Sequence, residues 1–258
     1  MALEENTSEK IYGNASIQIS ELVGRTFNNP LGEYPFERFA RIFEASSTKR
    51  VLDIGSGRGR AAILVARRFG LEVVAIEPSE EMAHFATDLV SREHLSNQVK
   101  ILNSDFLSAE LGAEPFQVVI SFDVLSYFPD KNLFFEKVAQ MLPKSCVVLF
   151  SDYFCSDPRE ARVRTIAQAW GITVPGDLNF YPEMLSRWGF RVDHFENTTP
   201  TYLAHWSEIK SRCVEKRRDL IASTSLGAVE RYFASVDSII EAVKTGKFGH
   251  LFCVSTRI

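Results

Sequence analysis

The sequence predicts an α/β protein with a doubly wound, mainly parallel sheet and a pair of helices inserted before the last strand. Two observations support this prediction. Short apolar runs alternate with helical patterns through the first two thirds of the 258 residues, an alternation typical of βαβ units. Near the end of the chain, two long helical patterns follow one another with no apolar run between them.

Five apolar runs in the first part of the chain are nearly continuous in Val, Ile and Leu, as expected of strands buried on both faces. These runs are 50–54, 72–76, 98–103, 116–122 and 145–152. Helical patterns lie between them at 58–69, 79–93 and 130–142. We therefore expect right-handed βαβ units and helices on both faces of the sheet.

The alternation changes after Asp152. The next elements are a helix over 157–169, a helix over 181–188 with Pro182 in its first turn, and a strand over 190–197. Two long helices then occupy about 201–222 and 225–245, and a closing strand occupies 250–257. We expect the two long helices to form a cap over the carboxyl edge of the sheet.

Composition excludes several functional classes. The chain is 45% hydrophobic and 24% charged, with a formal net charge of −4, which disfavours a nucleic-acid surface. No apolar run approaches the roughly 18 residues of a membrane span, so no membrane association is expected. The four cysteines show no paired or metal-ligating spacing and predict a reduced, cytoplasmic protein without a metal site; they are Cys146, Cys155, Cys213 and Cys253.

A glycine-rich turn follows the first strand. Gly55, Gly57 and Gly59 alternate with single residues in "LDIGSGRG", and glycine there lets backbone N–H groups approach a ligand at a helix N-terminus. The spacing differs from the GxGxxG of dinucleotide sites. Glu77 ends the second strand, where a carboxylate accepts hydrogen bonds from both hydroxyls of a ribose. The carboxylate of Glu77 fits NAD and S-adenosylmethionine (SAM) equally.

Further carboxylates favour SAM over NAD. Asp53 precedes the glycines and suits either the loop backbone or a methionine ammonium group. Asp105 ends the third strand, where it can accept from an adenine amino group, with Phe106 beside the ring. A pyrophosphate is repelled by so many carboxylates at one edge, whereas a sulfonium with an ammonium group is not.

The segments "VLDIGSGRG", "AIEPSEEM", "NSDFL" and "VVISFDVLSYF" together resemble the ordered motifs of class I SAM-dependent methyltransferases. The resemblance implies a Rossmann-like sheet of seven strands whose last strand is antiparallel, with the cofactor across the strand ends. It places the methionine part of the cofactor near the glycine loop, the ribose at Glu77, and the sulfonium near the backbone of Phe122. The cofactor-binding set is then Asn29, Asp53, Gly55, Ser56, Gly57, Glu77, Pro78, Asp105, Phe106 and Phe122.

A narrower resemblance spans more of the chain. Residues 11–32, 121–128, 151–158 and 199–209 resemble the phosphoethanolamine and sarcosine/dimethylglycine methyltransferase group. This resemblance implies that Tyr12 is a lid residue over the methyl donor and that Asp123 faces the acceptor. We therefore divide the chain into an N-terminal helical lid segment, a SAM-binding core, and a remainder that holds the acceptor-binding cap (about 198–247) and the closing strand; the boundaries are 1–49, 50–152 and 153–258.

The acceptor side departs from that group at two places. Tyr127 stands where the group commonly has a histidine, and residues 167–173 carry no Lys or Arg, which disfavours a phosphorylated base. The remaining candidates are aromatic or weakly acidic and suit a neutral or cationic small molecule. Catalytic candidates are Tyr12, Asp123, Tyr127 and His205; substrate candidates are Phe27, Tyr153, Tyr181, Tyr202 and Trp206. No supporting pattern surrounds His84, His94, His194 or His250.

The sequence thus predicts methyl transfer from SAM to a small molecule, with an amine nitrogen favoured weakly over oxygen or carbon. Two alternatives stay open. One is a methyltransferase-like protein that uses bound SAM as a non-redox group for a cyclisation in natural-product biosynthesis. The other is a non-catalytic SAM-binding partner, which the extended cap disfavours. The sequence does not indicate an oligomeric state.

Overall fold

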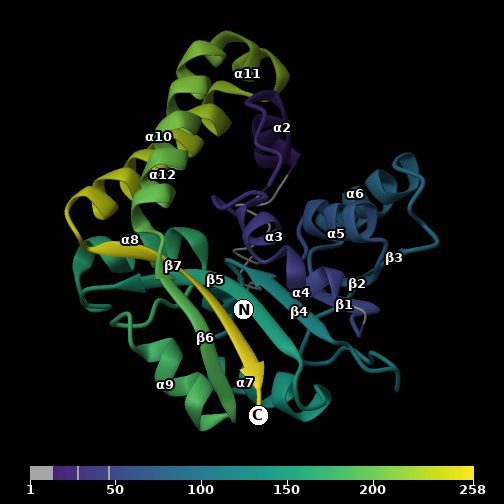
Figure 1. Ribbon diagram of the computed structural model, residues 1–258. Helices are drawn as coiled ribbons and strands as arrows, with labels where there is room; N and C mark the ends of the chain where they lie inside the picture. Colours follow the sequence, from purple (N-terminus) through teal and green to yellow (C-terminus); the bar gives the residue numbers. More distant parts are fainter. Residues whose placement is uncertain (1–13, 28, 46) are drawn as a thin grey trace, which may run out of the picture.

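The computed structural model describes residues 14–27, 29–45 and 47–258. A seven-stranded sheet has the order β3-β2-β1-β4-β5-β7-β6 (Figure 1). Its strands are β1 Arg50–Ile54, β2 Glu72–Glu77, β3 Val99–Asn103, β4 Val118–Phe122, β5 Val147–Cys155, β6 Phe190–Asn197 and β7 Phe248–Arg257. Only β7 is antiparallel to its neighbours, β5 and β6. The predicted α/β class, the seven strands and the antiparallel last strand are confirmed.

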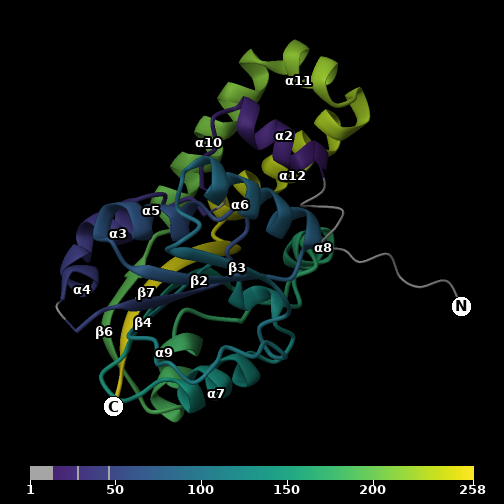
Figure 2. The ribbon, with the colours of Figure 1, turned by 90° about the vertical axis from the view of Figure 1, so that its right-hand side faces the viewer.

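Helices cover both faces of the sheet (Figure 2). One face packs against α3 (Tyr34–Arg38), α4 (Ala40–Glu44), α5 (Arg60–Phe69) and α6 (Glu80–Arg92). The other face packs against α7 (Lys131–Met141) and α9 (Phe180–Arg187). Each strand alternates its side chains between these two apolar layers, as the period of a strand requires. The sheet is therefore doubly wound.

A third apolar cluster lies above the carboxyl ends of the parallel strands. It joins α2 (Asn14–Leu22) and α8 (Ala161–Trp170) to α10 (Thr199–Glu215), α11 (Arg217–Ser223) and α12 (Leu226–Lys244). In Figure 1, α2 and α10 to α12 form the lobe that rises from the sheet. This lobe is the predicted cap, with the N-terminal helix packed into it.

The first long cap helix was predicted as one element over 201–222, and the structure divides it. α10 ends at Glu215 and α11 begins at Arg217. Residues 214–219 are all exposed, so no buried side chain there packs into the apolar core of the cap. Burial resumes at Leu220.

The topology brings the ends of distant strands together. The chain order reverses between β1 and β4, and ligands bind at such switch points outside the carboxyl ends of the strands. Because β7 is antiparallel, its beginning reaches this edge, and His250 pairs with Tyr153 near the end of β5. Among the described residues, no helix is long and apolar enough to cross a membrane.

Candidate active site

A cavity of about 1960 Å³ extends from the carboxyl ends of β1 to β4 into the cap. Its sheet side is formed by the glycine loop, the ends of the strands and the 3-10 turn η1 (Leu125–Tyr127). Its cap side is formed by residues of α2, α8, α10 and α12. Small-molecule pockets typically measure about 300–1,000 Å³, so this space accommodates a cofactor together with an acceptor.

The glycine loop is shaped by the packing of the protein as well as by the cavity. Gly55 has φ +71°, and a Cβ there would lie 2.4 Å from Cγ2 of Val124. Gly59 has φ +73°, and its Cβ would lie 3.0 Å from Cβ of Ala86. Gly57 lines the cavity and has φ +53°. Two of the three glycines are therefore required by contacts within the protein, and Gly57 is the one that faces Glu77.

Glu77 connects the end of β2 to the glycine loop. Its Oε2 accepts from Gly57 N at 2.8 Å, and its Oε1 accepts from Ser79 N at 2.9 Å. Burial raises the pKa of Glu77, and the hydrogen bonds from Ser79 and Gly57 partly oppose that rise. A carboxylate has about four lone-pair sites, so Glu77 can still accept from hydroxyl groups of a ligand in the cavity.

Asp53 and Ser56 lie behind the cavity wall. Asp53 is 2% exposed, and its Oδ2, like Oγ of Ser56, is buried without a hydrogen-bond partner among the described residues. Burial and then the Glu77 charge raise the pKa of Asp53 to about 7, against a hydrogen bond from the backbone of Ala62. Buried polar atoms are normally paired, so these two atoms leave bonding capacity next to the glycine loop.

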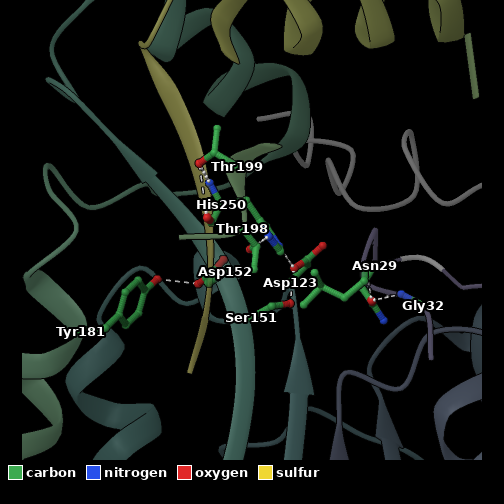
Figure 3. Close-up of polar contacts among 10 residues, drawn as sticks. Asn29, Gly32, Asp123, Ser151, Asp152, Tyr181, Thr198, Thr199 and His250 are labelled. Carbon is green, nitrogen blue, oxygen red and sulfur yellow. Dashed lines mark hydrogen bonds and ion pairs between the residues drawn. The ribbon is translucent and has the colours of Figure 1, made fainter. Parts of the chain in front are cut away.

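The other predicted cofactor residues divide into two groups. Pro78, Asp105, Phe106 and Phe122 line the cavity; Asp105 is exposed and accepts from Leu107 N at 2.8 Å. Asn29 lies outside the cavity wall. Its Oδ1 accepts from the backbone N–H groups of Leu31 and Gly32 (Figure 3), both at 3.0 Å. The structure thus gives the Oδ1 atom of Asn29 a part in closing its own turn, and a contact of Asn29 with the cofactor stays a prediction.

Asp123 follows β4 with φ +62°, a backbone conformation that non-glycine residues rarely adopt. This conformation directs the chain into η1 and leaves the carboxyl group in the cavity wall. Asp123 Oδ1 accepts from Ser151 Oγ at 2.5 Å and lies 2.8 Å from Nε2 of His250 (Figure 3). Burial by itself would raise the pKa of Asp123, but His250 and the hydrogen bonds from Ser151 and Tyr153 bring it below its usual value.

The aromatic candidates occupy different layers. Tyr127, Tyr153 and Trp206 line the cavity. Tyr202 lies behind them, fully buried and stacked on His250 with ring centroids 4.9 Å apart. Phe27 is outside the cavity wall and packs against the cluster that contains α3. The prediction that Phe27 contacts the acceptor is therefore corrected.

The prediction that Tyr181 contacts the acceptor is also corrected. Successive strand residues point to opposite faces, so Ser151 and Tyr153 point toward the cavity side while Asp152 points away. Tyr181 is fully buried and donates its hydroxyl to Asp152 Oδ2 at 2.5 Å, on the other side of β5 from Asp123 (Figure 3). It belongs to the core between β5 and α9.

His205 lies behind the cavity wall in α10. Burial, followed by the charge of Arg25, lowers the pKa of His205 to about 3, although the Asp123 charge opposes this. The imidazole is therefore neutral in ordinary buffers and a weak base. Tyr12 lies outside the described residues. In residues 14–27, 29–45 and 47–258 no group of three His, Cys, Asp or Glu side chains is placed to hold a metal ion.

Three residues that contact the candidate site were not singled out by sequence analysis. His250 meets Asp123 across 127 positions of sequence, and only the register of β7 against β5 brings them together. Arg25 lines the cap side of the cavity with its guanidinium 4.7 Å from the Trp206 ring. Arg58 is 2% exposed and pairs with Glu21 of α2, so that it joins the N-terminal segment to the glycine loop. No local pattern distinguishes these residues from ordinary charged side chains.

Comparison with known proteins places this geometry in a family. Residues 28–208 match the family model of a methyltransferase domain. The glycine/sarcosine/dimethylglycine N-methyltransferase of Actinopolyspora halophila is 26% identical over 178 residues, which are 69% of this chain and 32% of that protein. The sarcosine/dimethylglycine N-methyltransferase of Halorhodospira halochloris is 22% identical over 76% of this chain and 71% of that protein. The chain thus spans about a third of the first relative and most of the second.

Solved structures show the same fold. The phosphoethanolamine N-methyltransferase 2 of Haemonchus contortus, in complex with phosphomonomethylethanolamine and S-adenosylhomocysteine, superposes with a TM-score of 0.85 at 22% identity. That match covers 98% of this chain and 60% of that one. The cyclase SpnF has a TM-score of 0.68 at 18% identity, over 88% of this chain and 80% of that one. Since the family model matches most of the sequence, the chain belongs to the methyltransferase domain family.

Proposed function

We propose that this protein transfers a methyl group from SAM to an amine nitrogen of a small molecule. The observation that carries the proposal is a single cavity whose wall contains both the cofactor candidates around Gly57 and Glu77 and the carboxylate of Asp123. Named relatives that methylate sarcosine or dimethylglycine support it.

The residues present fit SAM. Glu77 would hold the ribose hydroxyls, Asp105 and Phe106 would hold the adenine, and the glycine loop would receive the methionine part. The buried oxygens of Asp53 and Ser56, which lack partners among the described residues, would complete the loop side of this site through the backbone or through ordered water. SAM supplies a methyl group on a positively charged sulfur, which is displaced in line by a nucleophile.

The chain's own residues would orient the acceptor. Asp123, with its lowered pKa, offers a negative charge to an ammonium or to an amine N–H group. Tyr127, Tyr153 and Trp206 add aromatic surface, which also favours cations. An acceptor that arrives as an ammonium has to release one proton to water before it can react. The neutral amine then carries its own lone pair and needs orientation more than further deprotonation, and this site provides orientation without a strong base.

Arg25 suggests a finer description of the acceptor. Its guanidinium belongs to the cap wall, next to Trp206, and guanidinium groups recognise carboxylates and phosphates. An amine that also carries an anionic group would place its nitrogen toward Asp123 and its anion toward the cap. The four free, buried cysteines agree with a cytoplasmic protein, a localisation we retain as part of the proposal.

The test is an acceptor screen with isotopically labelled SAM. We would offer matched sets of amines with and without a carboxylate or phosphate, together with phenols and alcohols, and locate the methyl group by NMR. Methylation on nitrogen supports the proposal. Methylation confined to oxygen or carbon, or conversion of an acceptor without methyl transfer, would contradict it, and the latter outcome would favour the cyclisation alternative.

A further inference from the structure

The Asp123 carboxyl group is supported by a histidine from the other end of the sequence. His250 is fully buried; its Nε2 lies 2.8 Å from Asp123 Oδ1 and its Nδ1 lies 2.6 Å from Thr198 Oγ1. We propose, building on the function proposed above, that His250 is a positioning residue of the reaction: it donates a hydrogen bond that keeps Asp123 ionised and oriented toward the acceptor nitrogen.

The direction of the hydrogen bond follows from the partners. An ionised carboxylate can only accept, so Nε2 of His250 carries the hydrogen in either protonation state of the ring. Thr198 can serve both states, because its hydroxyl donates to a neutral imidazole and accepts from an imidazolium. The carboxylate of Asp123 therefore sets Nε2 as the donor, and the hydroxyl of Thr198 is a suitable partner for Nδ1 in both protonation states.

The surroundings hold His250 in one orientation. Tyr202 stacks on the imidazole with an interplanar angle of 13°. The backbone N of His250 donates to Thr199 Oγ1 at 3.0 Å, and its carbonyl accepts from Thr198 N at 2.9 Å. Both threonines stand at the start of α10, so the same residues anchor the cap helix and the histidine. Ser151 donates to the same carboxylate oxygen from β5.

Other titratable groups surround Asp123 and have to be separated from His250 in any pH experiment. Asp152 and Tyr153 belong to β5, and the Asp123 charge also influences Tyr202 and His205 of α10 and Tyr181 of α9. Three neighbours favour the ionised carboxylate of Asp123 through hydrogen bonds: His250, Ser151 and Tyr153. Only His250 adds the capacity to carry a positive charge next to it.

The experiment compares variants of the whole protein. His250→Phe and His250→Leu both remove the donor, so that one serves if the other fails to fold. His250→Gln keeps an N–H donor at a similar reach, and Thr198→Val removes the hydroxyl that holds Nδ1. His194→Gln is the matched control, because His194 lies on the neighbouring strand β6 and pairs with Glu196 outside the cavity.

The first readout needs no enzymatic activity. Carbon-13 NMR of the carboxyl groups, with Asp123→Asn for assignment, gives the titration midpoint of Asp123 in each variant. We expect His250→Phe and His250→Leu to raise this midpoint by about 1–3 pH units, the range for losing a close favourable partner. Thr198→Val should raise it less, and His250→Gln should restore most of the wild-type value. An unchanged midpoint in both donor-free variants would overturn the proposal, whatever reaction the protein catalyses.

The second readout is kcat/KM for an acceptor found in the screen, expressed as the ratio of variant to wild type so that the acceptor's own titration cancels. For His250→Phe we expect this ratio to fall further at a pH below the NMR midpoint of Asp123 in that variant than at pH 8, and for His194→Gln we expect no pH dependence. A loss that is equal at both pH values would assign His250 a structural role only. If no amine is methylated, the function proposed above fails, while the NMR result still decides whether His250 controls Asp123.

Discussion

Gly55 and Val124 leave no room between them for a methyl group: a Cβ on Gly55 would lie 2.4 Å from Cγ2 and 2.7 Å from Cγ1 of the valine. The contact joins the loop after β1 to the residue that follows Asp123. It therefore fixes the cofactor side of the cavity relative to the acceptor side. A substitution at Gly55 should change the geometry of both sides.

Gly55→Ala should destabilise the protein by two separable effects, the positive φ and the overlap with Val124. Gly70→Ala is the matched control for the first effect, because Gly70 has φ +68° and no atom within 4 Å of its would-be Cβ; it should cost about 1–2 kcal/mol. Urea unfolding should show a larger loss for Gly55→Ala. The double variant Gly55→Ala/Val124→Ala should lose less unfolding free energy than the sum of the two single variants, because removal of the valine methyl groups relieves the overlap. Strictly additive losses would contradict the steric account.

Glu77→Ala and Glu77→Gln should weaken binding of S-adenosylhomocysteine by roughly 1.5–3 kcal/mol, the scale for hydrogen bonds to a charged group. Both variants lose acceptor capacity for a ribose and for Gly57 N. Glu72→Gln, at the exposed start of the same strand, should leave binding unchanged. Calorimetric titration measures all three variants, with NAD as a second ligand. An unchanged dissociation constant in a folded Glu77 variant would show that Glu77 does not bind the cofactor. Tighter binding of NAD than of S-adenosylhomocysteine would show that SAM is not the cofactor.

Asp53→Asn should stabilise the cofactor-free protein at pH 8 more than at pH 5. The pKa of Asp53 is raised to about 7 by burial and then by Glu77, so the folded state holds a proton that the unfolded chain releases near pH 4. The contribution of protonated Asp53 to the stability of the wild type is therefore complete below about pH 4 and is lost as pH rises to about 7. The increase in unfolding free energy caused by Asp53→Asn should be larger at pH 8 than at pH 5 by about 1–3 kcal/mol, measured by urea unfolding. Asp105→Asn, at an exposed site, should show no such trend.

The fold was predictable because each strand carries its own local signal. Buried parallel strands are continuous apolar runs, and the predicted runs at 50–54 and 72–76 differ from β1 and β2 by at most one residue. The predicted strand at 190–197, which is not continuously apolar, has the same bounds as the edge strand β6. The break between α10 and α11 was missed, because residues 201–222 keep a helical composition on both sides of Lys216. Only the lack of buried side chains over 214–219 shows why the helix stops.

The site was predictable where it follows strand ends and unpredictable where it depends on pairing. Glu77 ends β2, and Asp105 and Asp123 follow closely after β3 and β4, so the sequence places all three at one edge. His250 was passed over because its position depends on the antiparallel register between β5 and β7. Tyr181 was assigned to the acceptor because the sequence does not tell which face of the sheet α9 covers. In the structure it bonds Asp152, the one residue between Ser151 and Tyr153 that points away from the cavity.

Glu21→Gln should loosen the N-terminal segment from the glycine loop. Glu21 pairs with the guanidinium of Arg58, which is almost completely buried, and burial lowers the pKa of Arg58 to about 10 although Glu21 opposes this. Without the carboxylate charge, we expect a loss of about 1.5–3 kcal/mol in unfolding free energy, together with weaker binding of S-adenosylhomocysteine. Arg60→Gln removes only the more exposed partner of Glu21, at 3.5 Å, and should cost less than about 1 kcal/mol. Equal losses in the two variants would show that burial of Arg58 does not matter.

The last prediction ranks three residues on the acceptor side. Tyr127→Phe should slow turnover by about 5- to 100-fold, the effect of one hydrogen bond, and should leave cofactor affinity intact. A tyrosine hydroxyl near neutral pH orients an acceptor better than it removes a proton from it. Asp123→Ala should be more damaging, since it removes the charge that faces the acceptor. His205→Ala should have the smallest effect, because burial, followed by the charge of Arg25, lowers the pKa of His205 to about 3, too low for a general base at neutral pH. Steady-state kinetics of the three variants with the best acceptor found in the screen give the order. If His205→Ala abolishes the reaction while Asp123→Ala retains it, the site removes a proton from the acceptor and does not orient an amine, and the methyl group should then be found on oxygen.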